Sequence, residues 1–221
     1  MVLRPFPRVP GALAAFMRTI TVVVILLAAV SNSYGTQRDS LALRSKGSPT
    51  APVTMYEMSD FQCPYCREFA LTTLPIIERE YVRPGKVRIV YVNLPLTNLH
   101  ANAAAAAVAG LCAARQHKFW PMHDLLFQRQ DMWAKLAAPR PYFLALGDTL
   151  RLERGQFADC LVSAAAAREV EADGRRAERA GARSTPTFYI EGGLLEGAAP
   201  VAVFRTVLDS IYGSKTAPRP P

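Results

Sequence analysis

The stretch that decides the fold reads VTMYEMSDFQCPYCREFALTTLPIIEREY and runs from residue 53 to residue 81. Its first six residues, VTMYEM, are dense in β-forming and apolar side chains, which is typical of a buried central strand. After CPYC at residues 63–66, apolar side chains recur at intervals of three and four, so the sequence predicts a helix that opens at the cysteine pair. Pro64 suits the first turn of that helix, because its missing N–H is not needed there. Pro75 lies inside the helical pattern and is expected to kink it.

A second strand and a long helical region follow this stretch. The sequence RPGK at residues 83–86 ends the helix, and VRIVYV at residues 87–92 predicts a strand. The patterns are then helical from Leu99 to about Arg183. The β pattern returns in TFYI, a Gly-Gly turn and LLE at residues 187–196, which together predict a hairpin, and an amphipathic helix follows. The fold class is therefore α/β, with helices inserted between the second strand and the hairpin.

The net charge of +8 belongs to the ends of the chain. Residues 1–50 hold six basic side chains and one acidic one, and residues 214–221 hold two basic side chains. The body between them is nearly neutral. It lacks the basic surface through which DNA-binding proteins release counterions, so we expect no nucleic-acid partner.

The N-terminus has the pattern of an export signal. Three arginines precede or enter an apolar run at residues 19–30, TITVVVILLAAV. Such a helix spans roughly 18 Å, short of the roughly 30 Å hydrocarbon core of a bilayer. Ala29 and Ser31 are small residues that suit cleavage after Ser31, so residues 1–31 are predicted to be a signal peptide. The alternative is an uncleaved membrane anchor through residues 11–30. In both cases we expect the body to lie outside the cytosol.

Residues 32–52 are rich in polar and charged side chains without an apolar period, so we expect a flexible linker there. Residues 214–221, ending in TAPRPP, are predicted to be a disordered tail.

A CxxC sequence by itself is compatible with a redox pair or with half of a zinc site. Zinc needs two more close ligands, and Cys112 and Cys160 stand far apart in the sequence. The three histidines, His100, His117 and His123, lack HxxxH spacing. We therefore expect no metal and no cofactor, and His100 is interpreted as a surface or helix-cap residue.

The position of the cysteine pair favours redox chemistry. A thiol at the N-terminus of a helix lies near unpaired N–H groups and the positive end of the helix dipole, which stabilise its thiolate. Cys63 is placed for nucleophilic attack, and Cys66, one turn into the helix, is the natural resolving thiol.

The sequence EMSDFQCPYCREF, followed downstream by STPTFYI, resembles the DsbA-like thiol:disulfide oxidoreductases of the bacterial cell envelope, within the thioredoxin superfamily. The resemblance covers about residues 52–212 and implies a thioredoxin-like fold with a helical domain inserted before a cis-proline hairpin. The thioredoxin-like domain is then residues 53–98 and 184–213, and the helical insertion is residues 99–183. KFWPMHDLLF at residues 118–127 also resembles the second helix of that insertion.

The resemblance implies a role for each matching residue. Cys63 resembles the nucleophile and Cys66 its partner. Glu57 matches the acidic residue that the superfamily keeps beneath the active site as a proton relay; the alternative is a strand residue that faces solvent.

Substrate contacts are implied in the same way. Pro186, after Thr185, resembles the cis-proline that lies against the cysteine pair and presents backbone to a substrate strand; the alternative is an ordinary trans-proline in a turn. With Thr185, Pro64 and Tyr65 are expected to touch the substrate.

Cys112 and Cys160 are expected to form a structural disulfide, because a cysteine pair outside the cytosol is more often bridged than free. The expected function is disulfide donation by a monomer, with cysteine-containing proteins as substrates and a membrane redox partner that reoxidises the pair. A reductase or isomerase of the same fold is the main alternative, because Thr185 resembles those members. A metallochaperone, a glutathione-dependent transferase and a binding-only module fit the motifs less well.

Overall fold

The computed structural model describes residues 40–217. The predicted signal peptide or anchor, residues 32–39 of the predicted linker and residues 218–221 of the predicted tail lie outside the described residues. Within the described part of the chain, no helix combines the length and the hydrophobicity needed to cross a lipid bilayer.

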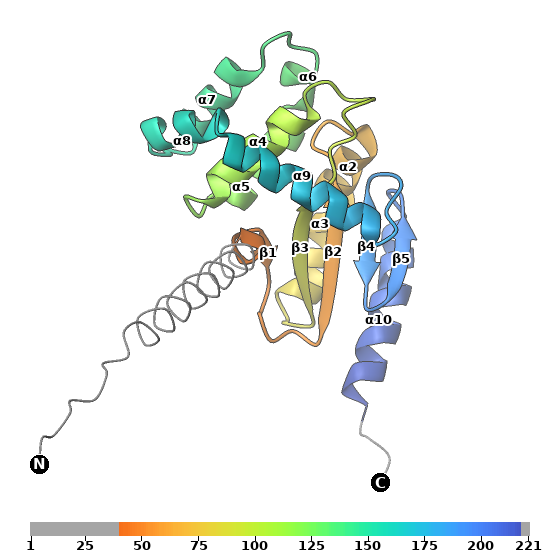
Figure 1. Ribbon diagram of the computed structural model, residues 1–221. Helices are drawn as coiled ribbons and strands as arrows, with labels where there is room; N and C mark the ends of the chain where they lie inside the picture. Colours follow the sequence, from red (N-terminus) through yellow and green to blue (C-terminus); the bar gives the residue numbers. More distant parts are fainter. Residues whose placement is uncertain (1–39, 218–221) are drawn as a thin grey trace, which may run out of the picture. The chain divides into compact units, whose positions relative to one another are not determined.

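A five-stranded sheet with the order β1-β3-β2-β4-β5 forms the centre of residues 40–217 (Figure 1). Its two long strands, β2 (Val53–Ser59) and β3 (Val87–Asn93), are parallel, with Glu57 opposite Tyr91. The hairpin of β4 (Thr187–Ile190) and β5 (Gly193–Glu196) adds antiparallel to β2. The short β1 (Ser45–Lys46) pairs antiparallel with the outer edge of β3. The central position of β2 explains its apolar composition.

The helix after the cysteine pair alternates between α-helical and π-helical turns. Its α-helical parts are α2 (Pro64–Glu68) and α3 (Leu74–Ile77), and the π-helical parts are η1 (Phe69–Thr73) and η2 (Glu78–Val82). Pro75 lies in the first turn of α3, directly after the first π-helical turn. The helix type therefore changes at Pro75, which has no N–H to donate, while the expected kink stays a prediction.

The helices between β3 and β4 confirm the predicted fold class. They are α4 (Ala103–Ala114), α5 (Phe119–Gln128), α6 (Gln130–Trp133), α7 (Arg140–Thr149), α8 (Arg154–Leu161) and α9 (Ala164–Arg179). Most of them cluster at one end of the sheet, while α9 runs from this cluster across one sheet face (Figure 1). The last helix, α10 (Val201–Thr216), lies on the opposite face.

The apolar core has three parts that follow from this layering. One sheet face packs against the helix at residues 64–82 and against α10, through buried side chains such as Phe69, Phe188 and Phe204. The other face packs against the C-terminal half of α9. A third cluster fills the helical insertion and extends to Phe61, Cys63 and Cys66. The cysteine pair therefore lies where the inserted helices meet the sheet.

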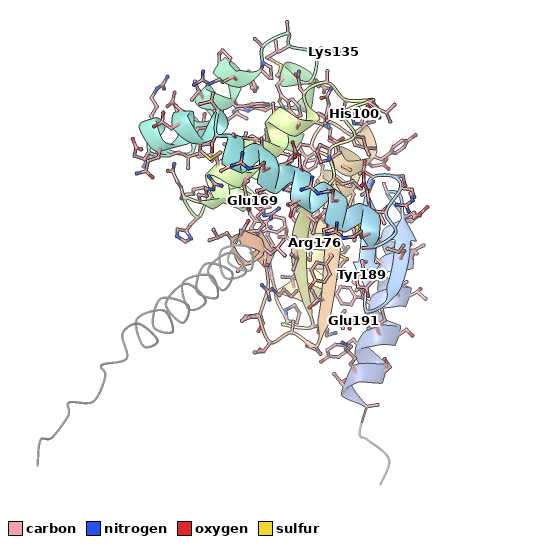
Figure 2. The ribbon with its side chains drawn as sticks, viewed as in Figure 1. His100, Lys135, Glu169, Arg176, Tyr189 and Glu191 are labelled. Carbon is pink, nitrogen blue, oxygen red and sulfur yellow. A yellow bond between two sulfur atoms is a disulfide. The ribbon has the colours of Figure 1, made fainter. Side chains whose placement is uncertain are left out.

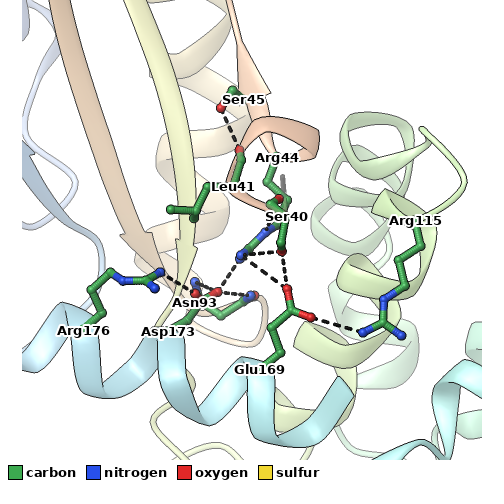
Figure 3. Close-up of polar contacts among 9 residues, drawn as sticks. All are labelled: Ser40, Leu41, Arg44, Ser45, Asn93, Arg115, Glu169, Asp173 and Arg176. Carbon is green, nitrogen blue, oxygen red and sulfur yellow. Dashed lines mark hydrogen bonds and ion pairs between the residues drawn. The ribbon is translucent and has the colours of Figure 1, made fainter. Parts of the chain in front are cut away.

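The predicted flexible linker is wrong for residues 40–46. Residues 40–43 form a helical turn, β1 follows, and Arg44 is 1% exposed. The Arg44 guanidinium is paired with the buried carboxylate of Asp173 on α9, which also accepts a hydrogen bond from the Asn93 side chain at 2.9 Å (Figure 3). The strand partners of this segment lie on β3, and the side-chain partners of Ser40 and Arg44 on α9 lie 129 positions away, so no local pattern indicates its order.

The predicted disordered tail also differs from the structure at its beginning. α10 continues to Thr216, so residues 214–216 are helical. The hydroxyl of Thr216 donates to the carbonyl of Tyr212 at 2.8 Å, one turn earlier in the same helix.

Candidate active site

The two cysteines of CPYC lie at the junction of β2 and α2. Cys63 is the N-cap residue of α2, and Pro64 occupies the first turn. Both thiols are free, and both are buried, with Cys63 4% and Cys66 0% exposed. The structure is therefore that of the dithiol form, with both cysteines almost entirely shielded from solvent.

The surroundings of the two thiols push their pKa values apart. The hydrogen bond from Cys66 lowers the pKa of Cys63 to about 6, with further help from Thr185 and from the backbone N–H groups of Cys66 and Tyr65. Burial, and then the interaction with Cys63, raise the pKa of Cys66 well above its usual range. At neutral pH the negative charge therefore resides on Cys63, which fits a nucleophile followed by a resolving thiol.

A cis peptide bond joins Thr185 to Pro186, next to the cysteine pair. The Cys63 thiol donates to the carbonyl oxygen of Thr185 at 3.4 Å, across 122 residues of sequence. Both residues of this peptide are buried at the start of β4. In contrast, Pro64 and Tyr65 are exposed, and the Tyr65 side chain is 62% exposed. The fold thus brings together all the residues named as substrate contacts.

Glu57 lies on β2, six residues before Cys63, and is completely buried. The alternative that it faces solvent is therefore wrong. Neither carboxyl oxygen has a hydrogen-bond partner within residues 40–217, and the same holds for Ser59 Oγ and Tyr91 OH. Burial raises the pKa of Glu57 to about 8, so its carboxyl is protonated at neutral pH.

Asp60 and His100 form a pair that the sequence interpretation missed. The Asp60 carboxylate is fully buried, and its Oδ2 lies 2.8 Å from His100 Nδ1. Figure 2 shows His100 beside the α2 end of the sheet, away from Glu191 at the other end. His100 is thus a partner of the residue three positions before Cys63, and not simply a surface or cap residue. An acid shortly before CxxC and a downstream histidine were the only signals available.

Two side-chain amides, those of Gln130 and Gln62, link the inserted helices to the CPYC loop. Gln130 on α6 donates to the carbonyls of Phe61 at 2.8 Å and Cys63 at 3.1 Å. The Gln62 amide donates to the carbonyl of Ala134 at 2.9 Å and accepts from the backbone N–H of Asn102 at 2.7 Å. Through these hydrogen bonds the inserted helices hold the CPYC loop in position. Sequence reasoning missed them, since isolated Gln and Asn residues give no local signal.

A disulfide joins Cys112 on α4 to Cys160 on α8, with the two Cα atoms 5.7 Å apart. Met122 and Phe127 are fully buried and belong to the core of the insertion. Within residues 40–217 there is no cluster of three or more metal-ligating side chains.

Comparison with known proteins agrees with this geometry. A protein-family model described as Thioredoxin matches residues 41–210. The chain belongs to this family. The structure of alpha-DsbA1 from Wolbachia pipientis superposes with a TM-score of 0.70 at 22% identity, over 78% of this chain and 92% of that one. The expected DsbA-like fold is therefore confirmed.

Two kinds of relatives align with the sequence. The chain is 29% identical over 164 residues to a probable disulfide bond formation protein D of Bacillus anthracis, with 73% of each chain covered. It is 33% identical over 170 residues to the Na(+)/H(+) antiporter NhaA 3 of Salinispora tropica, which covers 76% of this chain and 24% of the antiporter. The chain thus spans about a quarter of the length of the antiporters that it matches.

Proposed function

We propose that this chain is a thiol:disulfide oxidoreductase that donates disulfides to protein substrates through Cys63 and Cys66. The observation that carries the proposal is the position of one sulfur. Cys63 is the N-cap residue of α2, and its Sγ lies 3.4 Å from the Thr185 carbonyl, which precedes the cis peptide bond to Pro186. A stabilised thiolate beside the backbone that leads into β4 can exchange disulfides with an extended substrate segment that binds there.

The low pKa of Cys63 favours donation over reduction. A stabilised thiolate lowers the free energy of the reduced form, and this makes the disulfide a stronger oxidant. Tyr65 supplies no positive charge to the thiolate, so we assign an oxidant of intermediate strength.

Glu57 is proposed as the proton relay of this exchange. When the Cys63–Cys66 disulfide opens, Cys66 leaves as a buried thiolate and needs a proton. Because burial raises the pKa of Glu57 to about 8, its carboxyl carries a proton at neutral pH. Glu57 lies opposite Tyr91 in the β2–β3 pair and two residues before Ser59, and the hydroxyls of both are buried without a hydrogen-bond partner within residues 40–217.

The substrates are proposed to be unfolded or partly folded polypeptides. Large apolar side chains are exposed on segments that contact the CPYC loop: Tyr65 on α2, Leu99 before α4 and Met132 on α6 are 62%, 75% and 63% exposed. Exposed apolar side chains next to a reactive group suit segments that a folded client would bury.

The site of action is proposed to be the periplasm or cell envelope, and the working form a monomer. The structural disulfide Cys112–Cys160 and the separate redox pair Cys63–Cys66 suit an oxidising compartment. A membrane redox partner then reoxidises Cys63 and Cys66 after each donation. We retain residues 53–98 and 184–213 as the catalytic unit and residues 99–183 as the inserted helical unit.

The reduction potential of the Cys63–Cys66 pair tests the direction. Equilibration of the protein with glutathione buffers, followed by alkylation and mass spectrometry, should give roughly −120 to −230 mV, the interval from DsbA to the glutaredoxins. A potential near the thioredoxin value of about −270 mV makes this protein a reductase instead, which is the second candidate function. The Cys63→Ser variant is the control, since it has no disulfide to equilibrate.

A further inference from the structure

Three hydrogen bonds hold the buried carboxylate of Asp60. Its Oδ1 accepts from the backbone N–H of Gln62 at 2.7 Å, and its Oδ2 accepts from the backbone N–H of Leu96 at 2.8 Å. His100 Nδ1 lies 2.8 Å from the same Oδ2. An ionised carboxylate can only accept, so His100 is the donor. The His100 side chain is 19% exposed, so this is the side of the carboxylate that faces solvent.

The backbone of Asp60 contacts both cysteines. Its N–H donates to Cys66 Sγ at 3.5 Å, and its carbonyl accepts from the N–H of Cys63 at 3.1 Å. The hydrogen bonds to the Asp60 carboxylate therefore hold the Asp60 backbone in place. That backbone supplies the N–H that donates to the sulfur of Cys66.

We propose that the Asp60–His100 pair positions the Asp60 N–H to stabilise negative charge on Cys66 while the Cys63–Cys66 disulfide opens or closes. This inference rests on the proposed disulfide exchange. His100 acts through Asp60 and is a positioning residue.

The exchange step places charge on Cys66 in both directions. A substrate thiolate attacks Cys63 Sγ, a new disulfide forms between them, and the Cys63–Cys66 bond breaks with its electron pair on Cys66, which leaves as a thiolate. In the reverse step the Cys66 thiolate attacks Cys63 Sγ, and the substrate leaves as a thiolate. A donor held in place before the reaction stabilises the shared transition state without having to reorient.

Kinetics and equilibrium should therefore respond differently to the loss of His100. Burial keeps the Cys66 thiol protonated in the reduced form, so the Asp60 N–H meets a full charge on sulfur only during exchange. Weakening the pair should slow opening and closing by the same factor and leave the reduction potential unchanged.

The experiment compares His100→Leu, which removes the donor, with His100→Asn, which keeps an N–H at a similar distance from the backbone. In the full chain, reduced glutathione opens the Cys63–Cys66 disulfide, and Cys66 closes it again by resolving the Cys63–glutathione mixed disulfide. Acid quenching, alkylation and mass spectrometry give both rates. His100→Leu is expected to lower both rates about tenfold, the size of a lost hydrogen bond to a charged group, and His100→Asn to recover most of the loss.

His117→Leu is the matched control, since His117 is an exposed histidine beyond the end of α4, and it should keep both wild-type rates. The inference is overturned if His100→Leu keeps wild-type rates, if its reduction potential shifts along with them, or if His100→Asn is as slow as His100→Leu. A wild-type protein that does not exchange with glutathione at all contradicts the proposed function itself, which is a different result.

Discussion

Cys63 Sγ lies 3.4 Å from the carbonyl oxygen of Thr185, although 122 residues separate the two in sequence. The helical insertion occupies most of that interval, so the chain leaves the sheet after β3, builds a second core, and returns to place one peptide group against the nucleophile. The Thr185 carbonyl and the Cys63 sulfur, which lie on opposite sides of the insertion in the sequence, are therefore neighbours in the fold.

Replacing Cys66 with Ser should trap substrates on the protein. The low-pKa thiol of Cys63 still attacks a substrate disulfide, but no second thiol remains to resolve the mixed disulfide. Cys63→Ser should trap nothing, because burial keeps the remaining Cys66 thiol protonated. Non-reducing gels of each variant after incubation with an oxidised cysteine peptide measure the trapping. Equal trapping by both variants contradicts the assignment of the nucleophile.

The buried carboxyl of Glu57 should make the stability of the protein depend on pH. Burial raises its pKa from 4.5 to about 8, so between these values the folded state holds a proton that the unfolded state has released. The stability that this group contributes is present below the unfolded pKa and declines as pH rises toward the folded pKa.

Glu57→Gln removes this titration, so the variant should gain stability relative to wild type by about 4 kcal/mol between pH 5 and pH 8. Urea unfolding of both proteins across this interval measures the difference. A difference in unfolding free energy that stays constant with pH shows that Glu57 is not a neutral buried acid.

The elements that local sequence could predict are those built from contiguous apolar patterns. The strand at residues 187–190 coincides with β4, and the strands at residues 53–58 and 87–92 differ from β2 and β3 by one residue each. Most side chains of each of these strands are buried in the core, so the strand carries its own apolar pattern. Residues 40–46, in contrast, are ordered by partners on β3 and α9, so their own polar composition suggested a linker.

The same distinction applies to the active site. CPYC and the Thr-Pro dipeptide are contiguous motifs with a recognisable chemistry. His100 and Gln130 act on the site from 40 and 67 residues away, through single hydrogen bonds to Asp60 and to the Cys63 carbonyl. Lone polar residues in helical patterns are usually solvated, and the sequence offers no reason to treat these two differently.

The disulfide between Cys112 and Cys160 should be structural and independent of the catalytic pair. It links residues 48 positions apart. In the chain-entropy model, a cross-link that closes a loop of this length stabilises the folded state by about 4 kcal/mol. The Cys112→Ala/Cys160→Ala double variant should lose that stability and keep the reduction potential of Cys63–Cys66. Chemical denaturation and glutathione equilibration measure the two quantities. A changed potential means that the bridge takes part in redox control.

The last prediction concerns the buried ion pair of Arg44 and Asp173, whose side chains are each 1% exposed. Arg44→Met removes one partner and leaves the Asp173 carboxylate buried with Asn93 and Arg176 as its remaining neighbours. Breaking a buried pair in this way costs about 3–5 kcal/mol, so the midpoint of urea unfolding should fall strongly.

Arg175→Met on α9 is the matched control for Arg44→Met, because Arg175 pairs with Glu171 at 3.6 Å on the exposed face of the same helix. An exposed pair contributes at most about 1 kcal/mol, so this variant should unfold nearly as the wild type does. Substituting both buried partners, in Arg44→Met/Asp173→Leu, should recover much of the loss, since no unpaired charge then remains in the core. If Arg44→Met unfolds like Arg175→Met, residues 40–46 contribute little to the stability of the fold, and their order in the structure has no energetic consequence.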